Sequence, residues 1–221
     1  IWSYMLRKWE NKFKMLNKVT KPKLIIFSAP SGAGKSSLIK NIIEKSTGDI
    51  ELSISATTRP PRDGEEHGRD YFFISDEEFN ELRRSDSFIE HAIVHDYQYG
   101  TLQSFVEEKI QNGISIILDI DVQGFNLIRK SIEHNLSIFI IPPSIKELRK
   151  RLTSRGLDSS EVIEKRLLNA KTELKYAEQY DYIVLNDLFE NTLSELVSII
   201  NDENYTYDKE IHINLLKDLL D

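Results

Sequence analysis

The sequence has no cysteine and no long apolar run, and these two absences exclude several classes of protein. Without cysteine there can be no disulfide bond, thiolate metal site or cysteine nucleophile. The apolar run Leu136–Ile141 is much shorter than the about 18–20 residues of a membrane span, so we expect a buried strand there and no membrane partner. Because the absence of cysteine is typical of a reducing compartment, we predict a cytoplasmic protein.

Basic residues are also few, since 29 Lys and Arg stand against 36 Asp and Glu, for a net charge of −7. This balance provides no broad positive surface, and we expect no nucleic-acid partner. With 40% hydrophobic and 29% charged residues, the composition is that of an ordinary globular chain. The 221 residues suffice for a sizeable core, in one compact domain with insertions or in two lobes.

The N-terminal end differs from the rest of the chain in charge. Residues 1–23 contain seven basic side chains and one acid, a net charge of +6, so the remaining residues carry −13. We expect residues 1–22 to form a basic extension without a role in function, with Met5 or Met15 as alternative starts. Its apolar residues have the spacing of an amphipathic helix: Trp2, Met5, Leu6, Trp9, Phe13 and Leu16.

A glycine-rich loop follows the first apolar run. Leu24–Ser28 is typical of a strand and Ser37–Glu44 of a helix, and in that context the N–H groups of the loop form a cradle for phosphate. Lys35 adds a positive charge, and the Ser36 hydroxyl stands where such loops hold Mg²⁺. Ala29 replaces the glycine of the general pattern. The residues predicted to bind a nucleoside triphosphate are Ala29, Pro30, Ser31, Gly32, Ala33, Gly34, Lys35, Ser36 and Ser37.

Apolar runs and helical patterns alternate after this loop, which predicts a parallel sheet covered by helices on both faces. Residues 53–103 interrupt the alternation with short strands and a turn at Tyr97–Gly100, and we interpret them as an inserted substrate lobe. The further strands are predicted at Glu51–Ala56, Tyr71–Ile74, Phe88–Val94, Ile114–Asp119, Leu136–Ile141 and Tyr182–Leu185. The helices are predicted from Ser75 onward and at Thr101–Asn112, Val122–Glu133, Ser144–Leu152, Glu161–Tyr180 and Leu188–Ile200.

Two carboxylates follow one of the predicted buried strands. Asp119 ends the strand, and Asp121 comes two residues later. Ligands of open parallel sheets bind beyond the carboxyl ends of the strands, where a carboxylate commonly reaches Mg²⁺ through water. We therefore predict both as site residues, Asp119 as a metal ligand, although Asp121 could instead cap the helix that begins at Val122.

The inserted segment carries two arginines on a stiff loop. Arg59 and Arg62 flank Pro60 and Pro61, which restrict where the guanidinium groups can go. Paired guanidinium groups suit a phosphate group. Three hydroxyl groups of the same segment could add donors, those of Ser55, Tyr71 and Tyr99.

More arginines follow the Pro142-Pro143 break. Arginine on a closing flap can stabilise charge on a transferring phosphoryl group and exclude water. An ordinary basic helix face explains Arg149, whereas the flap role fits Arg151, Arg155 and Arg166. The five histidines have neither the spacing of a zinc site nor the pattern of a catalytic triad, so we favour neither chemistry.

Taken together, these motifs resemble guanylate kinase from about residue 23 to residue 201. The phosphate loop is shared by many proteins, whereas the block Ser55–Arg62 followed by Leu118–Gly124 is far more specific. Small departures at Ala29, Ala56 and Gln98 remove no charged group. The other matching segments are Gly64-Glu65 with Gly68, Asp70–Phe73, Phe88–Ala92, Tyr99–Thr101, Pro142–Ser144, Arg151–Gly156, Lys165-Arg166 and Val184–Asp187.

The resemblance implies an α/β fold with a three-layer P-loop NTPase core around a parallel sheet, an inserted lobe for a nucleoside monophosphate (NMP) and a helical lid. The implied boundaries are a basic extension at 1–22, a core of 23–52, 104–144 and 172–205, a GMP-binding lobe at 53–103, a lid at 145–171 and a C-terminal tail at 206–221.

For the acceptor, the resemblance implies that Glu90 and Thr101 read guanine. A carboxylate can accept hydrogen bonds from both N1–H and the exocyclic amine of guanine, a donor pair that adenine lacks. Asp121 would help to bind the same nucleotide. The GMP phosphate would be held by Ser55, Arg59, Arg62, Tyr71 and Tyr99.

For the donor, the resemblance implies ATP on the phosphate loop and Mg²⁺ near Ser36 and Asp119. Asn186 resembles the segment beside the adenine, although it could equally cap a helix. Charge on the transferring phosphoryl group would be neutralised by Lys35, Arg151, Arg155 and Arg166.

The implied reaction is ATP + GMP → ADP + GDP, with dGMP as a further expected acceptor. A kinase for another phosphorylated acceptor is one alternative, and Glu90 with Thr101 argues against it. The family also contains scaffold domains that bind peptides without catalysis, but those typically lack the intact phosphate loop that this chain keeps. The sequence leaves open whether the protein is a monomer or a homo-oligomer.

Overall fold

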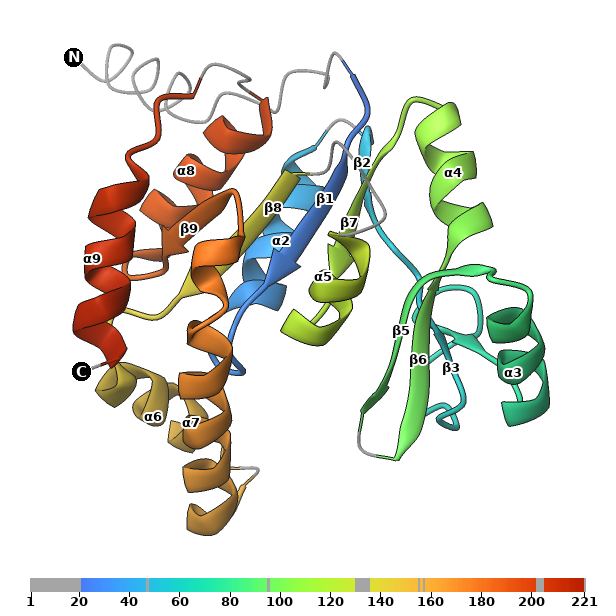
Figure 1. Cartoon of the computed structure of the whole chain (residues 1–221), viewed down its shortest axis with the longest axis horizontal. Coiled ribbons are helices and arrows are strands. Elements are labelled where there is room, and N and C mark those ends of the chain that lie inside the picture. The colour runs from blue at the N-terminus through green and yellow to red at the C-terminus, as the bar shows by residue number, and fades with distance from the viewer. Residues whose placement is uncertain are drawn as a thin grey trace. The chain divides into compact units, whose positions relative to one another are not determined.

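The computed structural model describes residues 21–46, 48–94, 96–129, 136–154, 156, 158–201 and 205–220 (Figure 1). The predicted extension at 1–22 lies outside these residues except for Lys21 and Pro22, and so does the predicted site residue Arg155. The fold is of the α/β class, as expected, with a five-stranded and a four-stranded sheet.

The five-stranded sheet has the order β2-β7-β1-β8-β9. Strands β1 and β7 pair in parallel with Leu24 opposite Ile116, and β8 and β9 pair in parallel with Ile138 opposite Tyr182. Apolar runs form these strands, and all five residues of β1 are buried. The bounds are β1 Leu24–Ser28, β2 Ile50–Leu52, β7 Ser115–Asp119, β8 Leu136–Ile141 and β9 Tyr182–Leu185.

The chain divides into two compact units, one with Ala29–Ile50 and Ser137–Asp221, the other with Pro22–Ser28 and Glu51–Leu136. The first unit contains the helices α2 (Lys35–Lys45), α6 (Ile145–Ser154), α7 (Ser160–Leu174), α8 (Phe189–Asn201) and α9 (Lys209–Leu220), with a short 3₁₀ helix at Ala177–Gln179. The second contains β3 (Ala56–Thr57), β4 (Phe72–Phe73), α3 (Asp76–Arg84), β5 (Phe88–Val94), β6 (Tyr97–Leu102), α4 (Gln103–Gln111) and α5 (Val122–Ile128).

In the first unit, α6 and α7 pack together through an apolar cluster of their own. Both helices present buried residues at spacings of three or four, the period of one helix face. The cluster consists of Leu148, Leu152, Ile163, Leu167 and Ala170, with Ile145 packed against it. This helix pair covers the predicted lid at 145–171 and extends beyond it to Leu174.

In the second unit, β3, β4, β5 and β6 form the four-stranded sheet in the order β4-β3-β6-β5. Helix α3 begins where expected, because the Ser75 side chain caps it by accepting from the N–H of Glu78 at 3.1 Å. Its buried Phe79 stacks on Phe88 of β5 at 4.5 Å between ring centroids. The contact holds the helix against the sheet.

Two local predictions in this unit are wrong. The expected turn at Tyr97–Gly100 is part of strand β6, which pairs antiparallel with β5, and the positive φ of 70° falls at Asp96 instead. The tyrosines there have a high strand propensity, which outweighs the turn signal of Gly100. The expected strand Glu51–Ala56 is interrupted, since β2 ends at Leu52 and β3 begins at Ala56 in the other sheet.

The predicted C-terminal tail contains a helix, α9, whose Leu216 and Leu219 are buried. Ahead of it, the Tyr207 hydroxyl accepts from the Ile183 N–H at 2.6 Å and donates to the Ile183 carbonyl at 3.0 Å. Tyr207 thereby holds the segment against β9, the last strand in the sheet order. Within the ranges described, no helix is long and apolar enough to cross a membrane.

Candidate active site

The phosphate loop joins β1 to α2. The Ala33 N–H donates to the Pro30 carbonyl at 3.0 Å, and both Gly32 and Gly34 have positive φ angles, 94° and 98°. Helix α2 begins at Lys35, and neither a side-chain cap nor an acid in its first turn is found among the described residues. Its N-terminus therefore offers N–H groups to an anion, as a phosphate site requires.

The loop packs against α6, the first helix of the predicted lid. A Cβ at Gly32 would lie 3.0 Å from Leu152 and 3.1 Å from Leu148, both in the apolar cluster of α6 and α7. Only a residue without a side chain fits there at that φ. The loop thus packs directly against this helix.

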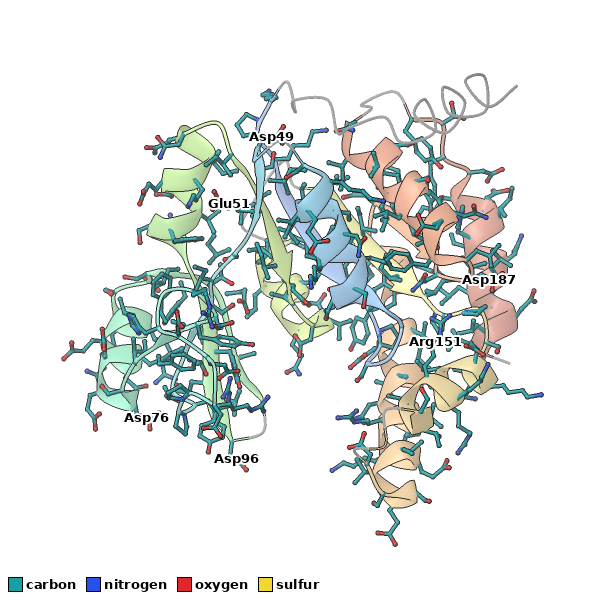
Figure 2. All side chains as sticks on the ribbon, turned by 180° about the vertical axis from the view of Figure 1, so that it is seen from behind. Asp49, Glu51, Asp76, Asp96, Arg151 and Asp187 are labelled. Carbon is teal, nitrogen blue, oxygen red and sulfur yellow. The ribbon has the colours of Figure 1, made fainter. Side chains whose placement is uncertain are left out.

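Arg151, labelled in Figure 2, extends from α6 and contacts the phosphate loop. Its Nη1 donates to the Ala33 carbonyl at 3.4 Å, and its Nη2 donates to the Asn186 carbonyl at 3.1 Å. Glu147 accepts from its Nε at 3.3 Å. The structure therefore brings together three predicted donor-site residues, Arg151, Asn186 and Ala33.

The other predicted lid arginines are placed differently. Arg166 pairs with Asp158, 2.9 Å away, and Arg155 is outside the described residues. Arg149 of α6 pairs with Glu164 of α7, which agrees with its interpretation as part of an ordinary helix face.

Two predicted acceptor residues of the second unit, Tyr71 and Tyr99, contact Arg59, which is buried. Its Nε donates to the Tyr99 hydroxyl at 3.2 Å, and its Nη2 donates to Glu65 at 2.9 Å. The guanidinium carbon lies 5.3 Å from the ring centroid of Tyr71, and Pro60 accepts from Nη1 at 2.9 Å. Since a guanidinium has five N–H groups, two remain to bind a phosphate.

Glu65 organises both arginines of this loop. Its other oxygen accepts from the Arg62 backbone N–H at 2.8 Å. That hydrogen bond and the Arg59 guanidinium lower the pKa of Glu65, so it stays ionised and holds Arg59 in place. Burial raises the pKa of Tyr71, so its hydroxyl remains a donor. The Ser55 carbonyl accepts a hydrogen bond from the N–H of Phe72 in β4.

Glu90 and Thr101 face each other on the paired strands β5 and β6. The Thr101 hydroxyl donates to Glu90 at 2.7 Å, and both residues are buried. Burial raises the pKa of Glu90 to about 7, with a contribution from the charge of Asp121, against the effect of the hydrogen bond from Thr101. A Cβ at Gly124 would lie 2.9 Å from Glu90, so the backbone of α5 lies directly against this carboxyl.

The two aspartates at the end of β7 differ in their surroundings. Asp119 is opposite Phe27 in the parallel pair and is exposed, while Asp121 accepts from the N–H groups of Gln123 and Gly124 at 3.0 and 2.9 Å. Asp121 therefore caps α5, the alternative left open by the sequence.

The oxygen donors of Asp119 and of Ser36, which is also exposed, are of the type that Mg²⁺ prefers. The described residues contain no group of three or more His, Asp or Glu side chains that could hold a metal ion. Because Mg²⁺ is usually held by one or two protein oxygens together with waters and phosphates, either donor fits it.

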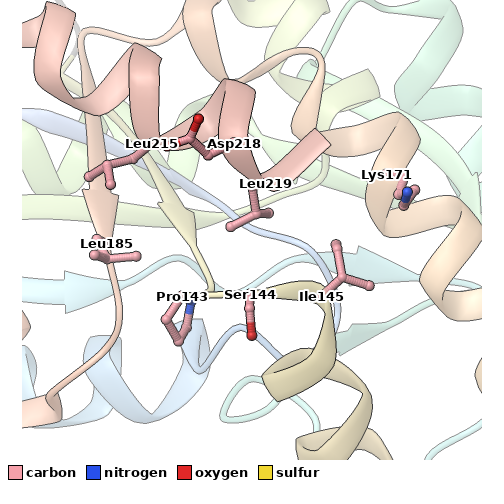
Figure 3. A pocket seen from close by; sticks show the side chains of 8 residues that line it. All are labelled: Pro143, Ser144, Ile145, Lys171, Leu185, Leu215, Asp218 and Leu219. Carbon is pink, nitrogen blue, oxygen red and sulfur yellow. The ribbon is translucent and has the colours of Figure 1, made fainter. Parts of the chain in front are cut away.

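A pocket of about 480 Å³ in the first unit is lined by none of the predicted site residues (Figure 3). Leu215, Asp218 and Leu219 of α9 form one side of it. Its other lining residues are Pro143, Ser144, Ile145, Lys171 and Leu185, none of which the sequence placed in the site.

Comparison with known proteins identifies the family of this chain. Residues 21–203 match the family model described as guanylate kinase. The chain belongs to the guanylate kinase family. Guanylate kinases of a Polaromonas species and of Escherichia coli are 46% and 45% identical to it, over 85% and 89% of this chain and 90% and 97% of theirs. The crystal structure of a guanylate kinase from Anaplasma phagocytophilum matches with a TM-score of 0.63 and 35% identity, over 84% of this chain and 88% of that one.

Three contacts of this guanylate kinase family member were absent from the sequence-based prediction. Glu65 was part of a matching motif, yet no pattern indicated that it binds Arg59. Gly124 also belonged to a motif, without a sign that Glu90 lies against it. Asp158, the partner of Arg166, lies in the turn between α6 and α7, and nothing in the sequence indicated that the two residues form an ion pair.

Proposed function

We propose that the chain transfers the γ-phosphoryl group of ATP to GMP, giving ADP and GDP. Membership of the guanylate kinase family supports this, and the observation that carries it is the buried pair of Glu90 and Thr101 beside an arginine site suited to phosphate. An oxygen of the GMP phosphate attacks the γ-phosphorus as its bond to the β–γ bridging oxygen breaks, and ADP leaves. The proposed site residues remain those predicted from the sequence.

In the acceptor site, the ionised Glu90 accepts from guanine N1–H and the exocyclic amine. Adenine would leave this buried carboxylate without those two donors, which costs of the order of 1–3 kcal/mol or more in comparable cases. The remaining N–H groups of Arg59, with Arg62 and the tyrosine hydroxyls of Tyr71 and Tyr99, bind the phosphate. These contacts fix the attacking oxygen.

In the donor site, the loop N–H groups and Lys35 bind the phosphates of ATP, and Arg151 is placed next to the loop. Lys35, Arg151, Arg155 and Arg166 neutralise charge as it moves to the leaving oxygen. Ser36 and Asp119 would each offer an oxygen to Mg²⁺, which would supply positive charge against that of the phosphates. A cytoplasmic location is part of this proposal and is supported by the absence of cysteine.

An ADP-release assay with ATP and each of GMP, dGMP, AMP, UMP and CMP tests this proposal. We expect turnover with GMP and dGMP well above the other three acceptors. Preference for another acceptor would favour the alternative kinase, and nucleotide binding without turnover would favour the non-catalytic binding module. Lys35→Ala is the matched control, because loss of its charge should lower turnover by orders of magnitude without lowering the melting temperature.

A further inference from the structure

The side chain of Asn186 is turned toward the phosphate loop. It is 5% exposed and follows β9, where its N–H donates to the Ile141 carbonyl at 2.8 Å. Its Nδ2 donates to the Ala33 carbonyl at 2.6 Å, across 153 positions of the sequence. The amide is therefore engaged by the backbone of the loop.

Gly34 leaves the space that this amide occupies. A Cβ at Gly34 would lie 2.3 Å from Asn186 Nδ2, so the amide would have to shift to make room for one. Gly34 also has a φ of 98°, a conformation that other residues rarely adopt. The φ angle favours glycine here, and the amide of Asn186 occupies the space that a side chain would need.

The Ala33 carbonyl decides where the next N–H points. In a trans peptide the carbonyl of one residue and the N–H of the following residue lie in one plane and point in opposite directions. Because the Ala33 carbonyl is held by Asn186 and Arg151, the Gly34 N–H is directed away from them. Glycine beside a peptide plane permits that plane to rotate, so a contact that holds the carbonyl matters at this position.

We infer that Asn186 is a positioning residue of the donor-phosphate site, which holds the Ala33–Gly34 peptide so that the loop presents an N–H and not a carbonyl oxygen to the phosphates. The inference rests on the proposed function in that the loop binds the donor triphosphate. Without this contact the peptide can turn its carbonyl toward the ligand, and a carbonyl repels phosphate. The loop would then need to be reordered on binding, which weakens affinity.

Calorimetry with ATP, and with tripolyphosphate as a probe that has no base, tests this role. Asn186→Ala should weaken the binding of both ligands by about tenfold, as expected for one lost hydrogen bond that positions a charged ligand, and should leave GMP affinity unchanged. An adenine contact would instead weaken ATP alone. Thr192→Val is the matched control, since the Thr192 hydroxyl donates to the nearby Leu185 carbonyl at 3.0 Å without contacting the loop.

If the Ala variant does not fold, Asn186→Asp replaces it in the experiment, because aspartate has the same shape as asparagine and keeps the packing. Its carboxylate cannot donate to the Ala33 carbonyl, but the protonated acid can. Arg151 faces this position, paired with Glu147, and lowers the pKa of the introduced carboxyl, while burial raises it. Relative to the wild type, we expect the loss of tripolyphosphate affinity to shrink as the pH falls from about 8 to about 5.

Three results would overturn the inference. The first is tripolyphosphate affinity within twofold of the wild type for both Asn186 variants. The second is an equal loss in Thr192→Val, which would make the effect one of general stability. The third is a deficit in Asn186→Asp that does not change with pH. If the wild type itself binds neither ATP nor tripolyphosphate, the proposed function is wrong as well, whereas the first three results leave that function intact.

Discussion

Affinity for GMP is expected to rise with pH as Glu90 loses its proton. Burial raises the pKa of this carboxyl to about 7, so near neutral pH the free protein holds both the protonated and the ionised form. Guanine presents two donors, and only the ionised carboxylate can accept from both. Binding of GMP should therefore release a proton from Glu90.

The magnitude follows from the fraction of Glu90 that is ionised. With a pKa of about 7, this fraction is about one tenth at pH 6 and about nine tenths at pH 8. The apparent dissociation constant varies as the inverse of the competent fraction, so it should fall about tenfold across this range. The stability of the ligand-free fold changes with pH in the opposite direction. A carboxyl whose pKa rises on folding stabilises the fold at low pH, and this contribution is lost as the pH rises through about 7.

Calorimetric titration with GMP in buffers of different ionisation enthalpy measures the dissociation constant and the protons released together. The GMP phosphate also titrates near pH 6, at about its second pKa. Glu90→Gln is the matched control, because it keeps the phosphate site and lacks the titrating carboxyl. If the wild type and this variant had the same pH dependence, Glu90 would not be the acceptor for guanine.

Three further outcomes test other contacts. Glu65→Ala removes the carboxylate that holds Arg59, so the KM for GMP should rise about tenfold with the KM for ATP unchanged, and equal increases would contradict this placement. Phe79→Ala should lower the free energy of unfolding in urea by about 3–5 kcal/mol, because the ring is buried, and a loss below about 1 kcal/mol would speak against the packing. Tyr207→Phe leaves both backbone groups of Ile183 without this partner, which should lower the same free energy by about 1–3 kcal/mol with kcat unchanged, whereas a fall in kcat would place Tyr207 in the site.

Local pattern was sufficient where a segment is apolar over its whole length. The strands β1, β8 and β9 have the predicted bounds, because short runs rich in aliphatic and β-branched residues between turn signals are typical of buried strands. The start of α3 was equally clear, since Ser75 is a strong cap and acids follow it in the first turn. The position of the phosphate loop followed from the strand and the helix predicted on either side of it, which correspond to β1 and α2.

Pattern alone was insufficient where tertiary contacts decide. Strand β6 is short and contains a glycine, and its pairing with β5 is what makes it a strand. Helix α9 has apolar residues at helical spacing, but polar residues precede it and the segment was predicted only as a tail. The direction of the Asn186 side chain depends on a loop 153 positions away, which no local signal can reveal.

The contact of Tyr207 with β9 has a consequence for self-association. The outermost strand of a sheet presents unpaired N–H and C=O groups, which are a template for adding a strand from another molecule. At Ile183 a single phenol both accepts and donates, so it satisfies the two groups that a sixth strand would need. A side chain of the same chain therefore takes the place of a further strand at Ile183. Loss of the segment that carries Tyr207 would leave the backbone of Ile183 available for strand pairing between copies, and so for aggregation.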